Sequence, residues 1–166
     1  MEIVLLADDP SAAKQVATWY FDEWISKIPG VTIDKVVNKL SKSTSRVNAP
    51  MLILAKSNED LVGAVELKLR EMDIYPEYEY WLGGLFVKQE VRRNGVGTLL
   101  VKEVIAKAKN AGIEKLYLQT EDLTGGLYST QGFEALKKTN YKGYNVLIMV
   151  ADLTTENNEG ITSDCG

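Results

Sequence analysis

The chain has 166 residues, of which 45% are hydrophobic and 25% charged, and its formal net charge is -4. This length and apolar content suffice for one compact domain with its own core. The negative charge argues against nucleic acid as a partner, because proteins that bind phosphate backbones usually carry a basic excess. The chain has no histidine, which excludes imidazole catalysis and His-based zinc sites, and we expect no bound metal.

The two ends of the chain bear on its compartment. Cys165 is the only cysteine, so an intramolecular disulfide is excluded and a reducing cytoplasm suits the chain. The segment 1–9 has no basic region, and its apolar run is too short for a signal peptide or membrane span. We therefore expect a cytoplasmic protein without a membrane partner, with one domain over residues 1–153 and a polar, flexible tail over residues 154–166.

The first third of the chain predicts a strand followed by two helices. Residues 3–7 predict the strand, and Asp9-Pro10-Ser11 offers a helix start, followed by apolar residues at helical spacing as far as Ile28. Pro29-Gly30 ends this helix, and Thr32 can cap a second one. The two helices precede the strands that form most of the predicted sheet.

The middle of the chain predicts three strands. Residues 51–55 and 61–69 predict a β-hairpin, and the acidic stretch Glu71 to Glu79 predicts a loop that leads into a strand over Tyr80 to Val87. Gly83-Gly84 lies near the middle of that strand. Paired glycines weaken a strand, and they are typical of a bulge or of a place where another backbone or a ligand comes close.

The last third predicts a long helix and three more strands. An apolar stripe from Val96 to Ala111 predicts the helix, Lys115 to Thr120 a strand, and Gly126 to Thr130 a short helix. Two strands follow over 134–153, around a turn at Lys142-Gly143. The order of elements has no internal repeat and no linker, so it predicts a single α/β domain with a mixed sheet covered by helices.

The turn before the long helix has the residues of a phosphate site. Arg92, Arg93, Gly95 and Gly97 stand where unpaired N–H groups meet the positive end of a helix, which is a ready pyrophosphate site. Glycines let phosphate oxygens approach the main chain, and the arginines can add charge-assisted bonds. A glycine-rich helix start with two solvated arginines is the structural alternative. The chain lacks the Rossmann and P-loop fingerprints.

Two motifs resemble those of the GNAT (Gcn5-related) acetyltransferases. Arg92-Arg93-Asn94-Gly95-Val96-Gly97 is similar to the coenzyme A motif Gln/Arg-x-x-Gly-x-Gly/Ala of that family. Leu127-Tyr128-Ser129-Thr130-Gln131-Gly132-Phe133 is similar to a second family signature, Leu-Tyr-x-x-x-Gly-Phe. The resemblance extends over nearly all of residues 3–153, and it is greatest to small bacterial members of the family.

The resemblance implies the GNAT fold, which has a central mixed, mostly antiparallel sheet whose fourth and fifth strands splay apart, flanked by helices. It implies that acetyl-coenzyme A binds as acetyl donor, with its pantetheine arm along the fourth strand like an added strand. Tyr128 matches the residue that protonates the departing thiolate; packing beneath the last hairpin is its structural alternative. The residues that it implies for cofactor binding are Leu85, Phe86, Val87, Arg92, Arg93, Asn94, Gly95, Val96, Gly97, Thr98 and Tyr128.

The chain departs from the family at one cofactor contact. Many members carry an asparagine shortly before the tyrosine, whereas this chain has the segment 120–126, Thr-Glu-Asp-Leu-Thr-Gly-Gly. The proton acceptor is also not given by a motif. Direct attack requires a neutral amine, and Glu79, just before the fourth strand, is the candidate base, with Glu71, Asp73 and Glu77 as competitors for the role.

The same acidic stretch predicts an entrance for cationic acceptors. Its carboxylates could form an acidic mouth with aromatic walls, and the residues that we expect to contact substrate are Trp24, Tyr80 and Trp81, with Tyr78 beside them. Ordinary core packing is the alternative for aromatic residues of the first helix. We interpret Tyr20 as a core residue, while Trp24 fits either role.

These observations predict an N-acetyltransferase that moves an acetyl group from acetyl-coenzyme A to a primary amine of a small molecule or a peptide N-terminus by direct attack. The alternative is a non-catalytic acyl-coenzyme A sensor or interaction module with the same fold. The residue pattern leaves open the acceptor, the preferred acyl chain, and whether the protein is a monomer or a homodimer.

Overall fold

The computed structural model describes residues 1–154, so the predicted flexible tail lies, from residue 155 onward, outside the described residues. Strands and helices follow one another in the predicted order. Their bounds are β1 (Glu2–Leu5), α1 (Ala13–Tyr20), α2 (Ile33–Leu40), β2 (Met51–Ser57), β3 (Asp60–Leu69), β4 (Tyr80–Val87), α3 (Val96–Asn110), β5 (Lys115–Thr120), the 3-10 helix η5 (Gly126–Gln131), β6 (Glu134–Tyr141) and β7 (Tyr144–Asp152).

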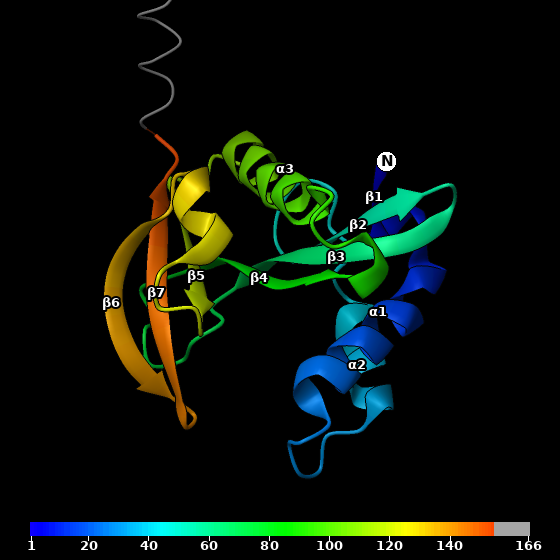
Figure 1. Cartoon of the computed structure of the whole chain (residues 1–166), viewed down its shortest axis with the longest axis horizontal. Helices are drawn as coiled ribbons and strands as arrows, with labels where there is room; N and C mark the ends of the chain where they lie inside the picture. The colour runs from blue at the N-terminus through cyan, green and yellow to red at the C-terminus, as the bar shows by residue number, and fades with distance from the viewer. Residues whose placement is uncertain (155–166) are drawn as a thin grey trace, which may run out of the picture.

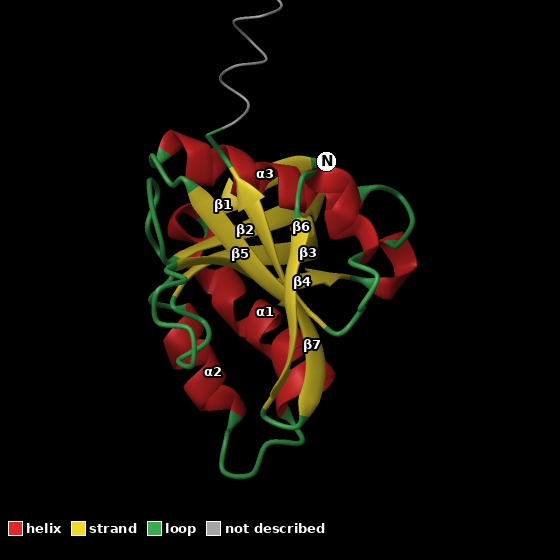
Figure 2. Ribbon diagram, turned by 90° about the vertical axis from the view of Figure 1, so that its left-hand side faces the viewer, coloured by secondary structure: helices red, strands yellow, loops and turns green. Residues whose placement is uncertain are grey.

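The described strands form one mixed sheet in the order β1-β2-β3-β4-β5-β7-β6. The pair β4–β5 is parallel and the other neighbouring pairs are antiparallel. Helices α1 and α2 cover one face of the β1–β4 half, and α3 lies on the opposite face (Figures 1 and 2). The predicted mixed, mostly antiparallel α/β fold is confirmed.

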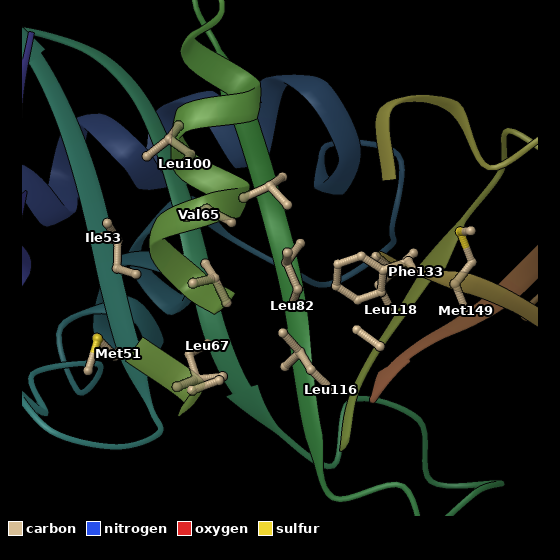
Figure 3. Packing of buried hydrophobic residues seen from close by; sticks show 14 of the residues in the cluster. Met51, Ile53, Val65, Leu67, Leu82, Leu100, Leu116, Leu118, Phe133 and Met149 are labelled. Atoms are coloured by element: carbon tan, nitrogen blue, oxygen red, sulfur yellow. The ribbon is translucent and has the colours of Figure 1, made fainter. Parts of the chain in front are cut away.

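Two apolar clusters hold these layers together, because successive side chains of β2 and β3 point to opposite faces of the sheet. One set packs under α1 and α2, including Leu52, Leu54 and Ala64. The alternate residues pack under α3 and continue toward β5 and β7 (Figure 3); they include Met51, Ile53, Val65, Leu67, Leu82, Leu100, Leu116, Leu118, Phe133 and Met149.

Strands β4 and β5 separate soon after they begin. They pair at one position, Trp81 opposite Tyr117, and Figure 1 shows β4 and β5 running in different directions beyond it. The separation leaves main-chain groups of β4 along residues 82–87 without a neighbouring strand on that side. The predicted splay of the fourth and fifth strands is confirmed, and it provides an edge to which an extended ligand can bind.

The glycine pair in β4 forms the expected bulge. The register between β3 and β4 shifts between Ala64 and Glu66, and Gly84 has a φ of 59°. A Cβ atom on Gly84 would lie 2.5 Å from the Tyr20 hydroxyl oxygen and 2.7 Å from Glu66 Oε2. Gly84 is therefore required both by its backbone conformation and by the side chains that press against it.

Replacing Gly84 by alanine is expected to lower the free energy of unfolding by about 3 kcal/mol, because left-handed strain adds to steric overlap. Gly112→Ala is the matched control. Gly112 also has a left-handed φ, of 77°, but a Cβ there would meet nothing within 4 Å, so its loss should be about 1 kcal/mol. Urea denaturation of both variants measures the difference, and equal losses would contradict the role of the overlap.

The first helix differs from the prediction near its end. It was expected to run to Ile28, but α1 ends at Tyr20 and continues as a wider π-helical turn over Phe21–Ile25, with the Ser26 N–H donating to the Phe21 carbonyl at 2.7 Å. Such single π turns are frequent at functional sites. The second helix begins as expected, since Thr32 Oγ1 accepts a hydrogen bond from the Lys35 N–H.

Candidate active site

The turn between β4 and α3 has the geometry of an anion site. Arg93 and Gly95 have left-handed φ values of 69° and 81°. The Gly95 carbonyl accepts the first helical bond, from the Leu99 N–H at 3.0 Å. The N–H groups of the first helical turn, residues 96–98, therefore point out of the helix end and toward any ligand placed there.

Gly97 leaves room that the protein itself does not need. A Cβ on Gly97 would lie 3.6 Å from the nearest side-chain atom, Leu127 Cδ2, which is ordinary van der Waals contact. Neither packing nor an unusual φ requires glycine here. This supports the interpretation that the small residue serves the close approach of a ligand to the helix end.

A groove of about 440 Å³ runs from this turn along β4. Most residues predicted to bind the cofactor line it, whereas Asn94 and Tyr128 are not among its lining residues. Glu23, Trp24 and Leu127 join the lining, and Trp24 is the predicted substrate residue that the structure does place there. The residues that line the groove are Glu23, Trp24, Leu85, Phe86, Val87, Arg92, Arg93, Gly95, Val96, Gly97, Thr98 and Leu127.

Contacts with β4 fix the position of Arg92 at one end of the groove. Its Nε donates a hydrogen bond to the Val87 carbonyl at 2.9 Å, and its guanidinium carbon lies 5.8 Å from the centre of the Phe86 ring. The Phe86 ring also stacks on Trp19 of α1, with ring centres 5.0 Å apart. The positive charge is thus held at the groove before any ligand arrives, which reduces the entropy lost on binding.

Tyr128 lies on η5, next to the groove residue Leu127. Burial, with a further contribution from the negative charge of Glu71, raises the pKa of Tyr128 to about 12. The phenol is therefore neutral at physiological pH and keeps its proton to donate. In the described part of the chain no hydrogen bond engages its hydroxyl group. Its ring also packs edge-on against Phe133, so the predicted structural role and a catalytic role can coexist.

Glu79 and Tyr80 stand at the far end of β4 from the phosphate turn. The Glu79 carboxylate is about half exposed and pairs with Arg70 at 3.3 Å. Tyr80 pairs with Leu69 in the sheet and packs against the core on the α3 side. Neither residue is part of the groove lining. Their predicted roles as base and as substrate contact stay predictions, without support from this arrangement.

Trp81 requires a correction. It was expected to contact substrate, but its side chain is completely buried and its indole N–H donates to the Tyr78 carbonyl at 2.6 Å. Tyr78 itself stacks on Tyr117, with ring centres 4.3 Å apart. These aromatic residues hold the loop between β3 and β4 against β5–β7, because apolar rings gain more from mutual packing than from facing water. They are not the walls of an open mouth.

The acidic stretch is likewise not a single mouth. The Asp73 carboxylate accepts a hydrogen bond from the Tyr141 hydroxyl at 3.2 Å, and Glu79 pairs with Arg70. Glu71 points inward, where Lys68 Nζ and Gln119 Nε2 donate to its two oxygens at 3.0 and 3.1 Å. The carboxylates therefore separate into a loop network and one half-buried group, Glu71.

Glu71 belongs to a cluster beside the β4 bulge, which we call the bulge cluster: Tyr20, Glu66, Lys68, Glu71 and Gln119. A Cβ atom on Gly84 would overlap with the side chains of Tyr20 and Glu66, and one on Gly83 with those of Lys68 and Glu71. The Tyr20 hydroxyl donates to the Gly84 carbonyl at 2.5 Å, so this core residue also anchors the bulge. The sequence analysis did not single out Glu66 as a site residue. The signal that could have identified it was a charged residue inside the apolar strand β3, opposite the paired glycines of β4.

The chain matches the acetyltransferase (GNAT) family over residues 13–133. This match covers most of the chain and includes α1, the β4 bulge, the phosphate turn and Tyr128. The protein therefore belongs to the GNAT acetyltransferase family, as the two motifs predict. A comparison of the sequence with curated proteins gave no match.

Solved structures with the same fold include three of particular interest. An aminoglycoside 6'-N-acetyltransferase complexed with coenzyme A has a TM-score of 0.71 at 16% identity, over 92% of this chain and 97% of its own. A ribosomal-protein-alanine N-acetyltransferase from Brucella melitensis also has 0.71, at 17% identity, over 92% and 99%. The third, yncA from Salmonella typhimurium with its cofactor acetyl-CoA, has 0.71 at 16% identity, over 92% and 94%.

Neither a membrane-spanning helix nor a metal site is found among residues 1–154. None of the described helices has the length and apolar character needed to cross a membrane. Within the same residues, no three metal-binding side chains come together.

Proposed function

We propose that this protein is an N-acetyltransferase that moves the acetyl group of acetyl-coenzyme A to a primary amine of a small molecule or a peptide N-terminus by direct attack. The observation that carries the proposal is the groove that joins the phosphate turn to the freed edge of β4, next to Leu127 and Tyr128. Family membership and the coenzyme A complexes of proteins with the same fold support this choice of donor.

Each part of the groove suits one part of the donor. The N–H groups of residues 96–98, with Arg92 and Arg93, would hold the pyrophosphate. Main-chain groups along residues 85–87 that have no partner in β5, apart from the Val87 carbonyl that accepts the Arg92 hydrogen bond, would bind the pantetheine arm as an added strand. The fit is supported by the space that Gly97 keeps open at the helix end.

Acetyl-coenzyme A supplies the activated acetyl group and its thiolate leaving group. The amine nitrogen forms a bond with the carbonyl carbon, and the bond from that carbon to sulfur breaks. Tyr128 donates its phenolic proton to the sulfur, which is feasible because the phenol is neutral, partly buried and not engaged in another hydrogen bond. The amine must lose one proton in the same reaction.

Calorimetric titration with acetyl-coenzyme A, followed by thiol release against a panel of primary amines and peptides, tests the proposal. Binding with amine-dependent thiol release is the expected result, and it identifies the class of acceptor. Binding without release under any amine would instead favour the acyl-coenzyme A sensor. No binding would refute the assignment of the phosphate turn.

A further inference from the structure

We infer that the acceptor amine arrives as an ammonium ion at the Glu66 carboxylate, which binds it and takes up the proton that it loses before attack. This inference rests on the proposed acetyltransferase function, and it assigns the proton acceptor to Glu66 on β3 rather than to Glu79. It also defines the acceptor as a cationic primary amine that reaches the β4 bulge on the face of the sheet covered by α1 and α2.

The first support is the unusual environment of Glu66. Only 8% of the residue is exposed, and no hydrogen-bond donor in residues 1–154 reaches its carboxylate. In the same part of the chain, every side-chain oxygen or nitrogen that is sealed from solvent has a partner. The Glu66 oxygens must therefore keep some contact with solvent. A nearly buried carboxylate with unused acceptor capacity is costly, and a cationic ligand would relieve that cost.

The second support is the balance of charge in the bulge cluster. Lys68 is in an ion pair with Glu71 at 3.0 Å, and Gln119 donates to the other Glu71 oxygen. Glu66 makes no such ion pair, and the only other lysine that influences it, Lys39 of α2, is exposed. When both carboxylates are ionised, the cluster has two negative charges and the one positive charge of Lys68, so one negative charge is in excess. One ammonium group would neutralise this excess charge. The cluster therefore favours an acceptor that has a single positive charge at the end that carries the reacting amine.

The third support is position. Glu66 lies opposite Gly83 in the sheet, and Gly84 is followed directly by the groove residues 85–87. Glu71, on the same cluster, is close enough to Tyr128 to contribute to the rise in its pKa. Glu66 and Tyr128 thus both lie within the electrostatic reach of Glu71, beside the stretch of β4 that leaves β5, although Glu66 is not among the residues that line the groove. Glu79 precedes Gly84 by five residues of extended strand, roughly 16 Å.

The protonation chemistry of the cluster is consistent with this role. Burial raises the pKa of Glu66, attraction by Lys68 opposes the rise, and repulsion by Glu71 adds to it. A raised pKa makes the carboxylate a better proton acceptor than an exposed one. The proton moves from the ammonium nitrogen to a Glu66 oxygen, the freed lone pair attacks, and Glu66 afterwards releases the proton to the solvent that it contacts.

Neighbouring groups stay in fixed charge states over the range that tests this role. Burial lowers the pKa of Lys68, but the negative charges of Glu71 and Glu66 raise it by more. The pKa of Lys68 therefore lies above its usual value. Burial and the same carboxylates hold the pKa of Tyr20 well above its usual value. Together with Tyr128 near 12, these groups keep their protonation states from pH 7 to 9. A change of rate over this range therefore does not arise from Lys68, Tyr20 or Tyr128.

The kinetic test compares Glu66→Gln, Glu79→Gln and Glu114→Gln, the last an exposed control between α3 and β5. At pH 7 we expect Glu66→Gln to lower kcat/KM about 100-fold for every panel amine that the parent acetylates. The acetyl-coenzyme A Kd should stay within twofold. The loss should shrink as pH rises to 9, because more of the amine is already neutral. A loss of equal size at each pH, or the same pH-dependent loss in Glu79→Gln, would overturn the inference.

A binding test does not depend on turnover. n-Butylamine and its uncharged analogue n-butanol are titrated against the protein with and without coenzyme A, and binding is followed by carboxyl carbon-13 NMR of glutamate. We expect butylamine, and not butanol, to shift one buried glutamate signal that is missing in Glu66→Gln. Absence of a Glu66-dependent shift would overturn the inference even if acetyl-coenzyme A binds. A shift without acetyl-coenzyme A binding would uphold the amine site and refute the proposed donor.

Discussion

Gly97→Glu is expected to abolish measurable binding of acetyl-coenzyme A while leaving the fold intact. The new carboxylate would stand at the end of α3 where the pyrophosphate is proposed to lie, and would repel it. Like charges brought together cost several kcal/mol, so the Kd should rise about 100-fold or more. The fold should tolerate the change, because a Cβ there makes ordinary contacts and the side chain can point into the groove.

The matched control is Ala106→Glu, on an exposed position of the same helix. It adds the same charge to α3 but away from the groove lining, so the Kd from calorimetry should change less than twofold. Thermal unfolding of both variants checks that the fold is kept. If Gly97→Glu bound the donor as tightly as the parent, the phosphate turn would not be the site of the pyrophosphate.

Local residue rules were sufficient for the elements that position the donor. The apolar stripe starting at Val96 and the strand ending at Val87 were predicted from spacing, and the structure places the helix start and strand end at these residues. The glycine pair predicted the bulge, because only glycine tolerates the left-handed φ and the close side chains found at Gly84. These features depend on a few neighbouring residues, so they could be predicted without tertiary contacts.

The side of the site proposed to receive the acceptor could not be predicted in the same way. The acidic stretch between β3 and β4 contains both exposed carboxylates and the half-buried Glu71, and their local sequence does not distinguish them. The distinction comes from partners far along the chain: Gln119 holds Glu71 inside, and Tyr117 stacks on Tyr78. Trp81 was misplaced for the same reason, since its burial depends on the cover that this loop provides.

The π turn at the end of α1 shows a second limit. Helical spacing predicts that an apolar stripe continues, but it does not report a local change from α to π hydrogen bonding. That change puts Glu23 and Trp24 at the groove, although Trp24 is 44% exposed and also lies near Tyr20 and Phe86. Both interpretations of Trp24, as packing and as groove lining, therefore describe part of its environment.

Tyr128→Phe is expected to lower kcat about 100-fold while the Kd for acetyl-coenzyme A stays within twofold, as loss of a general acid requires. The ring that packs on Phe133 is kept, and no protein hydrogen bond is lost in the described residues, so thermal unfolding should not change. With a pKa of about 12, the parent phenol stays protonated below that pH. The parent rate should therefore show no decline between pH 8 and 10 from loss of this proton.

Tyr144→Phe serves as control, since Tyr144 is 57% exposed on β7 and should leave kcat unchanged. Thiol release under saturating donor, with the donor Kd measured separately, distinguishes a chemical effect from a binding effect. An unchanged kcat in Tyr128→Phe would mean that the thiolate leaves without a proton from this residue, and Tyr128 would then keep only its packing role. A raised Kd with an unchanged kcat would instead place the hydroxyl among the donor-binding groups, because the interaction would be present equally before and during transfer.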